Sequence, residues 1–217
     1  GKLMVLRAFL LLIGLASTAV AESPAISWLA DASNRIGVWQ RHGDIAFPSG
    51  QIFVGDPTWG DDYHIRDPQT VPANTGTLYS FSKSVEGRNF LIWIEFTGEQ
   101  PVATGKALGF GMDAAMFAFG ALEGGQAFVD LGERLIDQGQ GDSHSFILPH
   151  IDQPRDYVKW LDIPRSRERI FLVSTGSDGG GQATWLIDAN GETSGILIDI
   201  AGRALDGRYL DKLLPAQ

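Results

Sequence analysis

The chain has 217 residues, 26 Asp and Glu against 17 Lys and Arg, a formal net charge of −9 and no cysteine. The acidic balance argues against binding to nucleic acid or to an anionic membrane surface, because their phosphates would be repelled. Without cysteine the chain has neither disulfides nor a thiol nucleophile. A chain of this length usually forms one domain that buries its own core.

The first residues predict a secretory signal peptide, residues 1–21. Lys2 and Arg7 form a basic start, the apolar run after them is too short to span a bilayer, and a small-x-small cleavage site ends at Ala21. Cleavage would leave residues 22–217 as a single domain with 15 basic and 26 acidic side chains, a net charge of −11. We therefore expect a periplasmic or secreted protein with no stable membrane insertion after cleavage. An exported protein without disulfides is ordinary in the bacterial periplasm.

The first half of the mature chain predicts one helix and then strands. Ser23 can cap a helix, and apolar residues recur at helical spacing as far as Arg41. A short strand is expected at Gln51 to Val54. The runs Leu78 to Ser82 and Phe90 to Phe96 predict a hairpin, and the second run is apolar enough to lie centrally in a sheet.

The middle of the chain is less regular. Lys106 to Gly120 contains three glycines and predicts a strand, followed by a turn at Gly124 and Gly125 and a helix over Gln126 to Gln138. Three prolines indicate irregular chain over residues 146–164. The run Asp61-Asp62-Tyr63-His64 predicts an exposed acidic loop, which could also face a partner. A short helix is expected over Ala204 to Leu214.

The stretch from Ile170 to Ile200 is the clearest piece of local organisation. It predicts three strands, Ile170 to Val173, Ala183 to Ile187 and Gly195 to Ile200, as a meander on which the sheet assembles. A glycine-dense turn separates the first two. Asn190-Gly191 between the last two predicts a type I′ hairpin turn, which needs positive φ at both central residues. Strands outnumber helices in mixed order, so the expected fold class is α+β, with a largely antiparallel sheet, a few flanking helices and a single domain.

Three segments in order resemble the bacterial family known as domain of unknown function 4241. Ser49 to Pro57 is similar to its S-G-x-[apolar]3-x-D-P segment. Gly109 to Ala114 is similar to its G-[aromatic]-G-V-D-A-G segment, although Ala115 stands where the family has glycine; Phe128 to Asp130 follows. Ser174 to Ile200 is similar to its glycine turn, hairpin and closing D-F.

The resemblance covers about residues 48–200, which is most of the mature domain. It implies a shared β-rich fold. It implies no activity, since the family has none that could be carried over.

Asp56, Asp113 and Asp178 fall one in each of these three segments, and they are the candidate site residues. If the three carboxylates converge, they could hold Mg²⁺ or Ca²⁺, which prefer oxygen ligands, and the cation could activate a water for hydrolysis. Alternatively each aspartate accepts hydrogen bonds from backbone N–H groups at its own turn, which is the usual role of Asp beside Gly or Pro. We favour the turn role, with no metal or other cofactor.

The sequence thus leaves three hypotheses of function. The first, which we favour, is a periplasmic binding or interaction protein that recognises a basic protein partner, for example as an immunity protein does. The second is a metal-assisted hydrolase that uses Asp56, Asp113 and Asp178. The third is an envelope protein in which the three segments only shape the fold.

Overall fold

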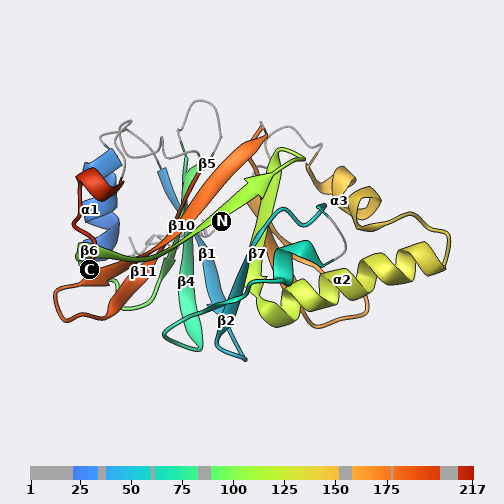
Figure 1. Cartoon of the computed structure of the whole chain (residues 1–217), viewed down its shortest axis with the longest axis horizontal. Helices are drawn as coiled ribbons and strands as arrows, with labels where there is room; N and C mark the ends of the chain where they lie inside the picture. Colours follow the sequence, from blue (N-terminus) through green and yellow to red (C-terminus); the bar gives the residue numbers. More distant parts are fainter. Residues whose placement is uncertain are drawn as a thin grey trace, which may run out of the picture.

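A computed structural model describes residues 22–33, 38–59, 62–82, 89–151, 158–176, 178–200 and 210–217. Two antiparallel sheets lie face to face, with helices on both outer sides (Figure 1). The fold is α+β, as the sequence predicts. The expected signal peptide, residues 1–21, lies outside the described residues.

The larger sheet has six strands. In spatial order they are β1 (Val38–Ala46), β4 (Thr75–Ser82), β5 (Asn89–Glu95), β11 (Thr193–Ile200), β10 (Gly179–Asp188) and β6 (Pro101–Met112). The smaller sheet has five strands. In spatial order they are β3 (Gln69–Thr70), β2 (Gln51–Gly55), β7 (Met116–Ala121), β9 (Arg169–Ser174) and β8 (Val158–Asp162).

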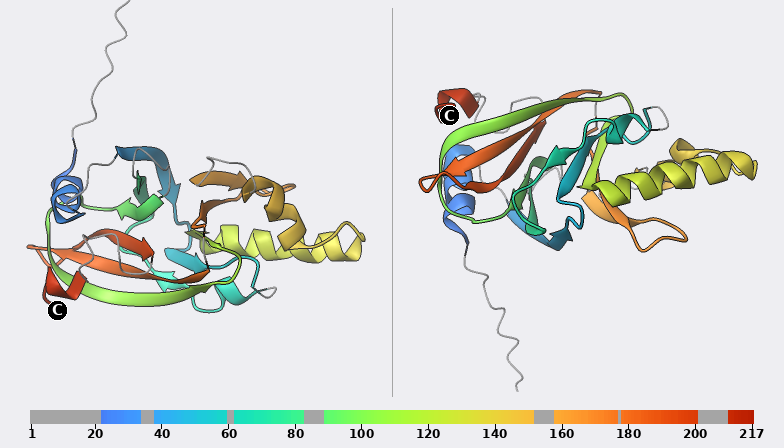
Figure 2. Two further views of the ribbon diagram at one scale, coloured as in Figure 1. Left: turned by 90° about the horizontal axis from the view of Figure 1, so that it is seen from above. Right: turned by 60° about the horizontal axis from the view of Figure 1, so that its bottom comes forward.

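The helices complete a four-layer arrangement. The first outer layer is α1 (Pro24–Ser33), against the large sheet, and the last is formed by α2 (Leu122–Asp137) and α3 (Ser143–Ile151), against the small sheet. Two 3-10 turns, η1 (Tyr63–Ile65) and η2 (Leu210–Lys212), complete the described elements. Figure 2 shows the same succession of layers from two other directions.

Each interface between layers has its own apolar cluster. The central cluster alternates residues of both sheets, such as Ile94 and Ile196 from one and Phe117 and Phe171 from the other. Because successive side chains of a strand point to opposite faces, the other residues of the same strands pack outward. Trp93 thus meets the face covered by α1.

The predicted hairpins of the large sheet are confirmed. Strands β4 and β5 pair antiparallel, and β5 lies centrally between β4 and β11. Strands β10 and β11 also pair, and Gly191 has φ of +79°. The predicted turn type is wrong, since φ at Asn190 is not positive. Instead, the Asp188 side chain accepts hydrogen bonds from the backbone N–H groups of Asn190 and Glu192, which holds a longer loop.

The meander is only half correct. Strand β9 lies in the small sheet beside β7, whereas β10 and β11 lie in the large one, so the glycine-rich segment after β9 connects the two sheets. The expected helix to Arg41 is also wrong in its second half. Helix α1 ends at Ser33, and Trp39 lies in β1, where its ring packs 5.1 Å from that of Phe81. Long-range pairing has overridden a local helical spacing.

The middle of the chain is more regular than its composition suggests. The stretch Lys106 to Gly120, expected to form one strand, belongs to two strands, β6 and β7. Helix α2 begins at Leu122 and includes Gly124 and Gly125. These glycines allow close packing: a Cβ on Gly124 would lie only 2.7 Å from the carbonyl oxygen of Arg169. The region expected to be irregular contains α3 and β8. Asp142, just before α3, accepts the backbone N–H of Ser145 at 2.8 Å.

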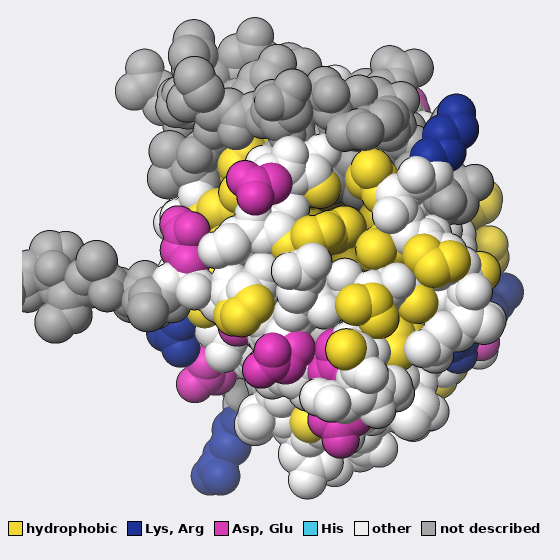
Figure 3. Space-filling model, turned by 90° about the vertical axis from the view of Figure 1, so that its left-hand side faces the viewer, with side chains coloured by type: hydrophobic (Ala, Val, Ile, Leu, Met, Phe, Trp, Pro, Cys, Tyr) yellow, Lys and Arg dark blue, Asp and Glu magenta, His cyan; other side chains and the backbone are white. Residues whose placement is uncertain are grey.

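At the C-terminus, residues 204–209 of the expected helix lie outside the described residues. Residues 210–212 of the expected helix form η2, which ends at Lys212. Figure 3 shows the side of the molecule that carries α1, where acidic side chains lie around a band of hydrophobic ones and basic side chains lie towards the rim.

Candidate functional site

The turn between β6 and β7, residues Asp113 to Ala115, is where the three sequence segments meet. Asp56 follows β2 and is buried. Its Oδ1 accepts the backbone N–H and the hydroxyl of Thr58, at 2.8 and 2.6 Å. Its Oδ2 accepts the backbone N–H groups of Asp113 and Ala114, at 2.7 and 3.1 Å. One carboxylate thus stabilises its own turn and a turn 57 residues further along the chain.

Asp178 holds the other side of the same turn. Its Oδ1 accepts the backbone N–H of Ala115 at 2.9 Å, and the carbonyl of Ala115 accepts the N–H of Thr175 at 2.7 Å. Ala115 has φ of +52°, a left-handed conformation that favours glycine, as the resembling family has at this place. The two aspartates together hold a strained turn.

The three segments therefore meet at one turn, but the arrangement is not a cluster of ligand oxygens. Asp113 takes part through its backbone, and its side chain is exposed. Both carboxylate oxygens of Asp56 face N–H and O–H donors. No group of three His, Asp or Glu side chains within the described part of the chain could hold a metal ion. The expectation that each aspartate acts only at its own turn is also too narrow, because Asp56 and Asp178 bond to a distant one.

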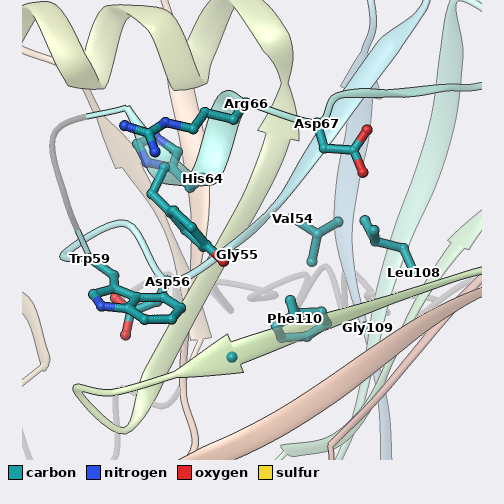
Figure 4. Close-up of a pocket in the computed structure, with 12 residues that line it drawn as sticks. Val54, Gly55, Asp56, Trp59, His64, Arg66, Asp67, Leu108, Gly109 and Phe110 are labelled. Atoms are coloured by element: carbon teal, nitrogen blue, oxygen red, sulfur yellow. The ribbon is translucent and has the colours of Figure 1, made fainter.

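A cleft of about 450 Å³ opens beside this turn, between the two sheets (Figure 4). We call it the aromatic cleft. Three segments line it: Val54 to Asp56 with Trp59 at and after the end of β2, Tyr63, His64, Arg66 and Asp67 in and after η1, and Leu108 to Gly111 of β6. Its volume falls within the usual range for small-ligand pockets, about 300–1,000 Å³.

Two half-exposed aromatic side chains, Trp59 and Tyr63, form one wall of the aromatic cleft. They are 45% and 48% exposed, and their ring centroids lie 4.5 Å apart. The Trp59 ring reaches across to β6, where a Cβ on Gly111 would lie 3.4 Å from it. Arg66 lies over the Tyr63 ring and pairs with Asp62 at 2.6 Å. The aromatic wall is thus held in place at both ends and still faces solvent.

The charge that remains available in the aromatic cleft is negative. Arg66 is neutralised by Asp62. The carboxylate of Asp67 is exposed, points away from Arg66 and forms no ion pair with any described residue (Figure 4). Aromatic faces attract cations, and a carboxylate adds to that attraction. The cleft therefore has the chemistry to accept an apolar group, a cationic group, or a side chain that is both.

His64 lies behind the aromatic wall, buried under α2 between the rings of Phe53 and Phe128. Neither ring nitrogen has a hydrogen-bond partner among the described residues. Burial lowers the pKa of His64 to about 4; the backbone of Gly125 and the charge of Asp56 oppose this shift but do not outweigh it. His64 is therefore neutral at pH 7. The exposed loop predicted for residues 61–64 is wrong at this position.

Sequence reasoning found Asp56, Asp113 and Asp178 but missed Trp59, Tyr63 and Asp67 as a group. The signal available was an aromatic–charged segment, W-G-D-D-Y-H-I-R-D, directly after a motif of the resembling family. The alternative that this segment faces a partner stays a prediction. The segment alone does not reveal the opposite wall of the cleft, because β6 forms it from more than 40 residues away.

Searches against protein-family models, curated proteins and solved structures found no match. The resemblance to the family of unknown function therefore stays a prediction. No helix in the described part of the chain is long and apolar enough to cross a membrane.

Proposed function

We propose that this protein is a binding protein that recognises a basic protein partner through the aromatic cleft. The observation that carries the proposal is the pairing of two half-exposed aromatic rings with the carboxylate of Asp67 at one cleft. Large aromatic side chains usually dominate the energy of protein interfaces when they are buried against a partner. Trp59 and Tyr63 are half exposed to water, so burial of their rings against a partner would add apolar contact area that stabilises the complex.

The charge of the whole chain supports a basic partner. A net charge of −9 attracts a positively charged protein over long range and raises the rate of encounter. On the other side of η1, a shallower hollow is lined by Glu123, Asp130 and Glu168, which adds three carboxylates near the aromatic cleft. A basic surface that covers η1 could contact both.

The setting is part of the same proposal. We place the protein in the bacterial periplasm or outside the cell, on the strength of the basic start, apolar run and cleavage site in residues 1–21. There it could neutralise a basic partner, as immunity proteins do. The second hypothesis, a metal-assisted hydrolase, gains no support, because Asp56 is committed to the turn that it holds.

Capture from a periplasmic extract, followed by binding measurements with the purified partner, tests the proposal. Three variants are compared with the unchanged protein: Trp59→Ala, Asp67→Asn and, as a control, Ile136→Ala. Ile136 is 55% exposed on α2, so its truncation removes an exposed apolar side chain far from the cleft in sequence.

We expect Trp59→Ala to weaken binding at least ten-fold, as truncation of a buried interface aromatic typically does. Asp67→Asn should weaken binding less, and the loss should shrink with added salt. Ile136→Ala should bind normally. A partner that binds Trp59→Ala as tightly as the unchanged protein would show that the aromatic cleft is not the interface.

A further inference from the structure

Strand β6 is the last strand of the six-stranded sheet, so one of its two edges is not covered by the sheet. On one side it pairs with β10 from Pro101 to Met112. No described strand continues the sheet on the other side. An open edge presents a row of backbone N–H and C=O groups and is a template for pairing with another extended chain.

The C-terminal residues already use this edge at one point. The N–H of Thr104 donates to the carbonyl of Pro215 at 2.8 Å, and the N–H of Gln217 donates to the carbonyl of Thr104 at 2.9 Å. Thr104 and Ala216 form a parallel bridge. The edge of β6 therefore accepts an extended segment with ordinary hydrogen-bond geometry, and the backbone groups of Thr104 face outward.

Strand geometry identifies the next outward-facing groups. β6 has one extra residue relative to β10 between Thr104 and Ala107, because Thr104 lies opposite Leu186 and Ala107 lies opposite Thr184. Outward-facing and inward-facing residues alternate along a strand, and one extra residue shifts this alternation by one position. Thr104 faces outward before the bulge, so the outward-facing residues after it have odd numbers. We therefore expect the N–H and C=O groups of Ala107, Gly109 and Gly111 to face outward. No hydrogen bond joins them to any described residue outside the sheet.

This open stretch of edge lies in the aromatic cleft. Gly109 and Gly111 both line it, and a Cβ on Gly109 would meet no atom within 4 Å. The face of the strand at Gly109 therefore has room for a side chain. Trp59 lies beside Gly111, at the end of the stretch.

From these observations we infer that the ligand of the aromatic cleft is an extended, basic peptide segment that adds a strand to the β6 edge over Ala107 to Gly111. This inference rests on the proposed function and names the form in which the partner is bound. Backbone hydrogen bonds provide affinity in this mode of recognition, and pockets for alternate side chains provide specificity. One side chain of the segment enters the cleft against Trp59 and Tyr63, and a cationic group pairs with Asp67.

Charge favours a basic segment over a second copy of this chain. Pairing of two β6 edges would bring together two proteins that each carry a net charge of −9, near the exposed carboxylates of Asp67 and Asp113. The short-range repulsion opposes such a dimer. A Lys-rich or Arg-rich segment would instead be attracted to the same groups.

The test uses a synthetic library of nine-residue peptides that carry Lys or Arg at alternate positions and random residues between them. Two matched libraries serve as controls: one has Glu in place of the basic residues, and one has N-methylated backbone amides at every second position, which removes the donors for strand pairing. Binding is measured by fluorescence polarisation with the full chain and with two variants, Gly109→Pro and Gly109→Ala.

Proline removes the outward N–H of residue 109 but is tolerated on an edge strand, because that N–H does not bond within the sheet. Alanine keeps the N–H and fits the open space. We expect the best basic peptides to bind, their Glu and N-methyl counterparts to bind at least ten-fold more weakly, and Gly109→Pro to lose about ten-fold in affinity relative to Gly109→Ala.

Equal binding by Gly109→Pro and Gly109→Ala, or by N-methylated and unmodified peptides, would overturn strand addition. If the captured partner still required Trp59, the proposed function would survive that result. Failure of every library to bind would also overturn the inference. So would self-association of the unchanged protein that Gly109→Pro abolishes, because the edge would then be an interface between copies of this chain. If Gly109→Pro does not fold, the N-methyl comparison decides the question on the unchanged protein.

Discussion

Replacement of Asp56 by asparagine tests whether one side chain holds the two turns together. Asn has nearly the same size, so the change leaves the packing intact and alters only charge and hydrogen bonding. Asp56 accepts four hydrogen bonds, two from Thr58 and two from the backbone of the turn between β6 and β7. An amide has only one acceptor oxygen. Its NH₂ group must therefore face donors on one side or the other.

The loss can be estimated from these contacts. A hydrogen bond to a charged group contributes about 1.5–3 kcal/mol, and a neutral one about 1 kcal/mol. The best orientation of Asn keeps its oxygen on Asp113 and Ala114 and turns its NH₂ towards the Thr58 hydroxyl, which can accept. The Thr58 N–H then loses its partner and the other bonds lose their charge. We expect a loss of about 3 kcal/mol in the free energy of unfolding. For a domain of this size that corresponds to a fall in Tm of roughly 6–12 °C.

The assay is thermal and urea unfolding followed by circular dichroism, with Asp178→Asn and Asp113→Asn as graded controls. Asp178 is exposed and makes one hydrogen bond to the turn, so its change should cost about 1 kcal/mol. The exposed side chain of Asp113 should contribute less than about 0.5 kcal/mol. Equal losses in the three variants would refute this reasoning. So would a rise of several degrees with Mg²⁺ or Ca²⁺ that is absent in Asp56→Asn, because the carboxylates would then be acting as metal ligands.

Two further predictions concern neighbouring residues. The folded state keeps His64 neutral while the unfolded state gains a proton, so the free energy of unfolding should fall as pH drops from about 6.5 to about 4, by up to about 1.4 kcal/mol per pH unit. Urea unfolding of His64→Leu at several pH values across this range should show that the free energy of unfolding depends less steeply on pH, by about that amount. An unchanged dependence on pH would mean that His64 is protonated in the folded state. Ala115→Gly should raise the free energy of unfolding by about 0.5 kcal/mol, because it relieves a left-handed backbone. The same change at Ala114, where φ is not positive, should lower it, and a loss at both positions would show that the turn is not strained.

Part of the candidate site could be predicted from the chain alone. Asp56 and Asp178 stand beside proline and glycine, and their role as acceptors for backbone N–H groups is the ordinary chemistry of such positions. What those positions do not reveal is the identity of the distant donors. Asp56 bonds to Asp113 and Ala114 only because β2 and β7 are neighbours in the small sheet.

The errors in the predicted fold have the same origin. Proline and glycine content indicated irregular chain around Pro149 and a turn at Gly124, yet both residues lie in helices. Helix α3 is held by the burial of Ile147, and Gly124 lies where α2 approaches β9 too closely for a side chain. Local propensity is a weak guide wherever tertiary packing supplies more free energy than the propensity costs.

Local patterns in the chain are enough to predict the fold class, the central hairpins of the large sheet and the acidic balance of charge, because apolar periodicity, turn residues and charge can be recognised without knowing any long-range contact. The pairing and packing of the folded chain settle which sheet each strand joins, that His64 is buried, and that Trp59 and Asp67 line one cleft with the glycines of β6. These features depend on contacts between residues far apart in the chain. Such contacts are selected by the packing of whole faces against one another, and no short stretch of sequence contains that information.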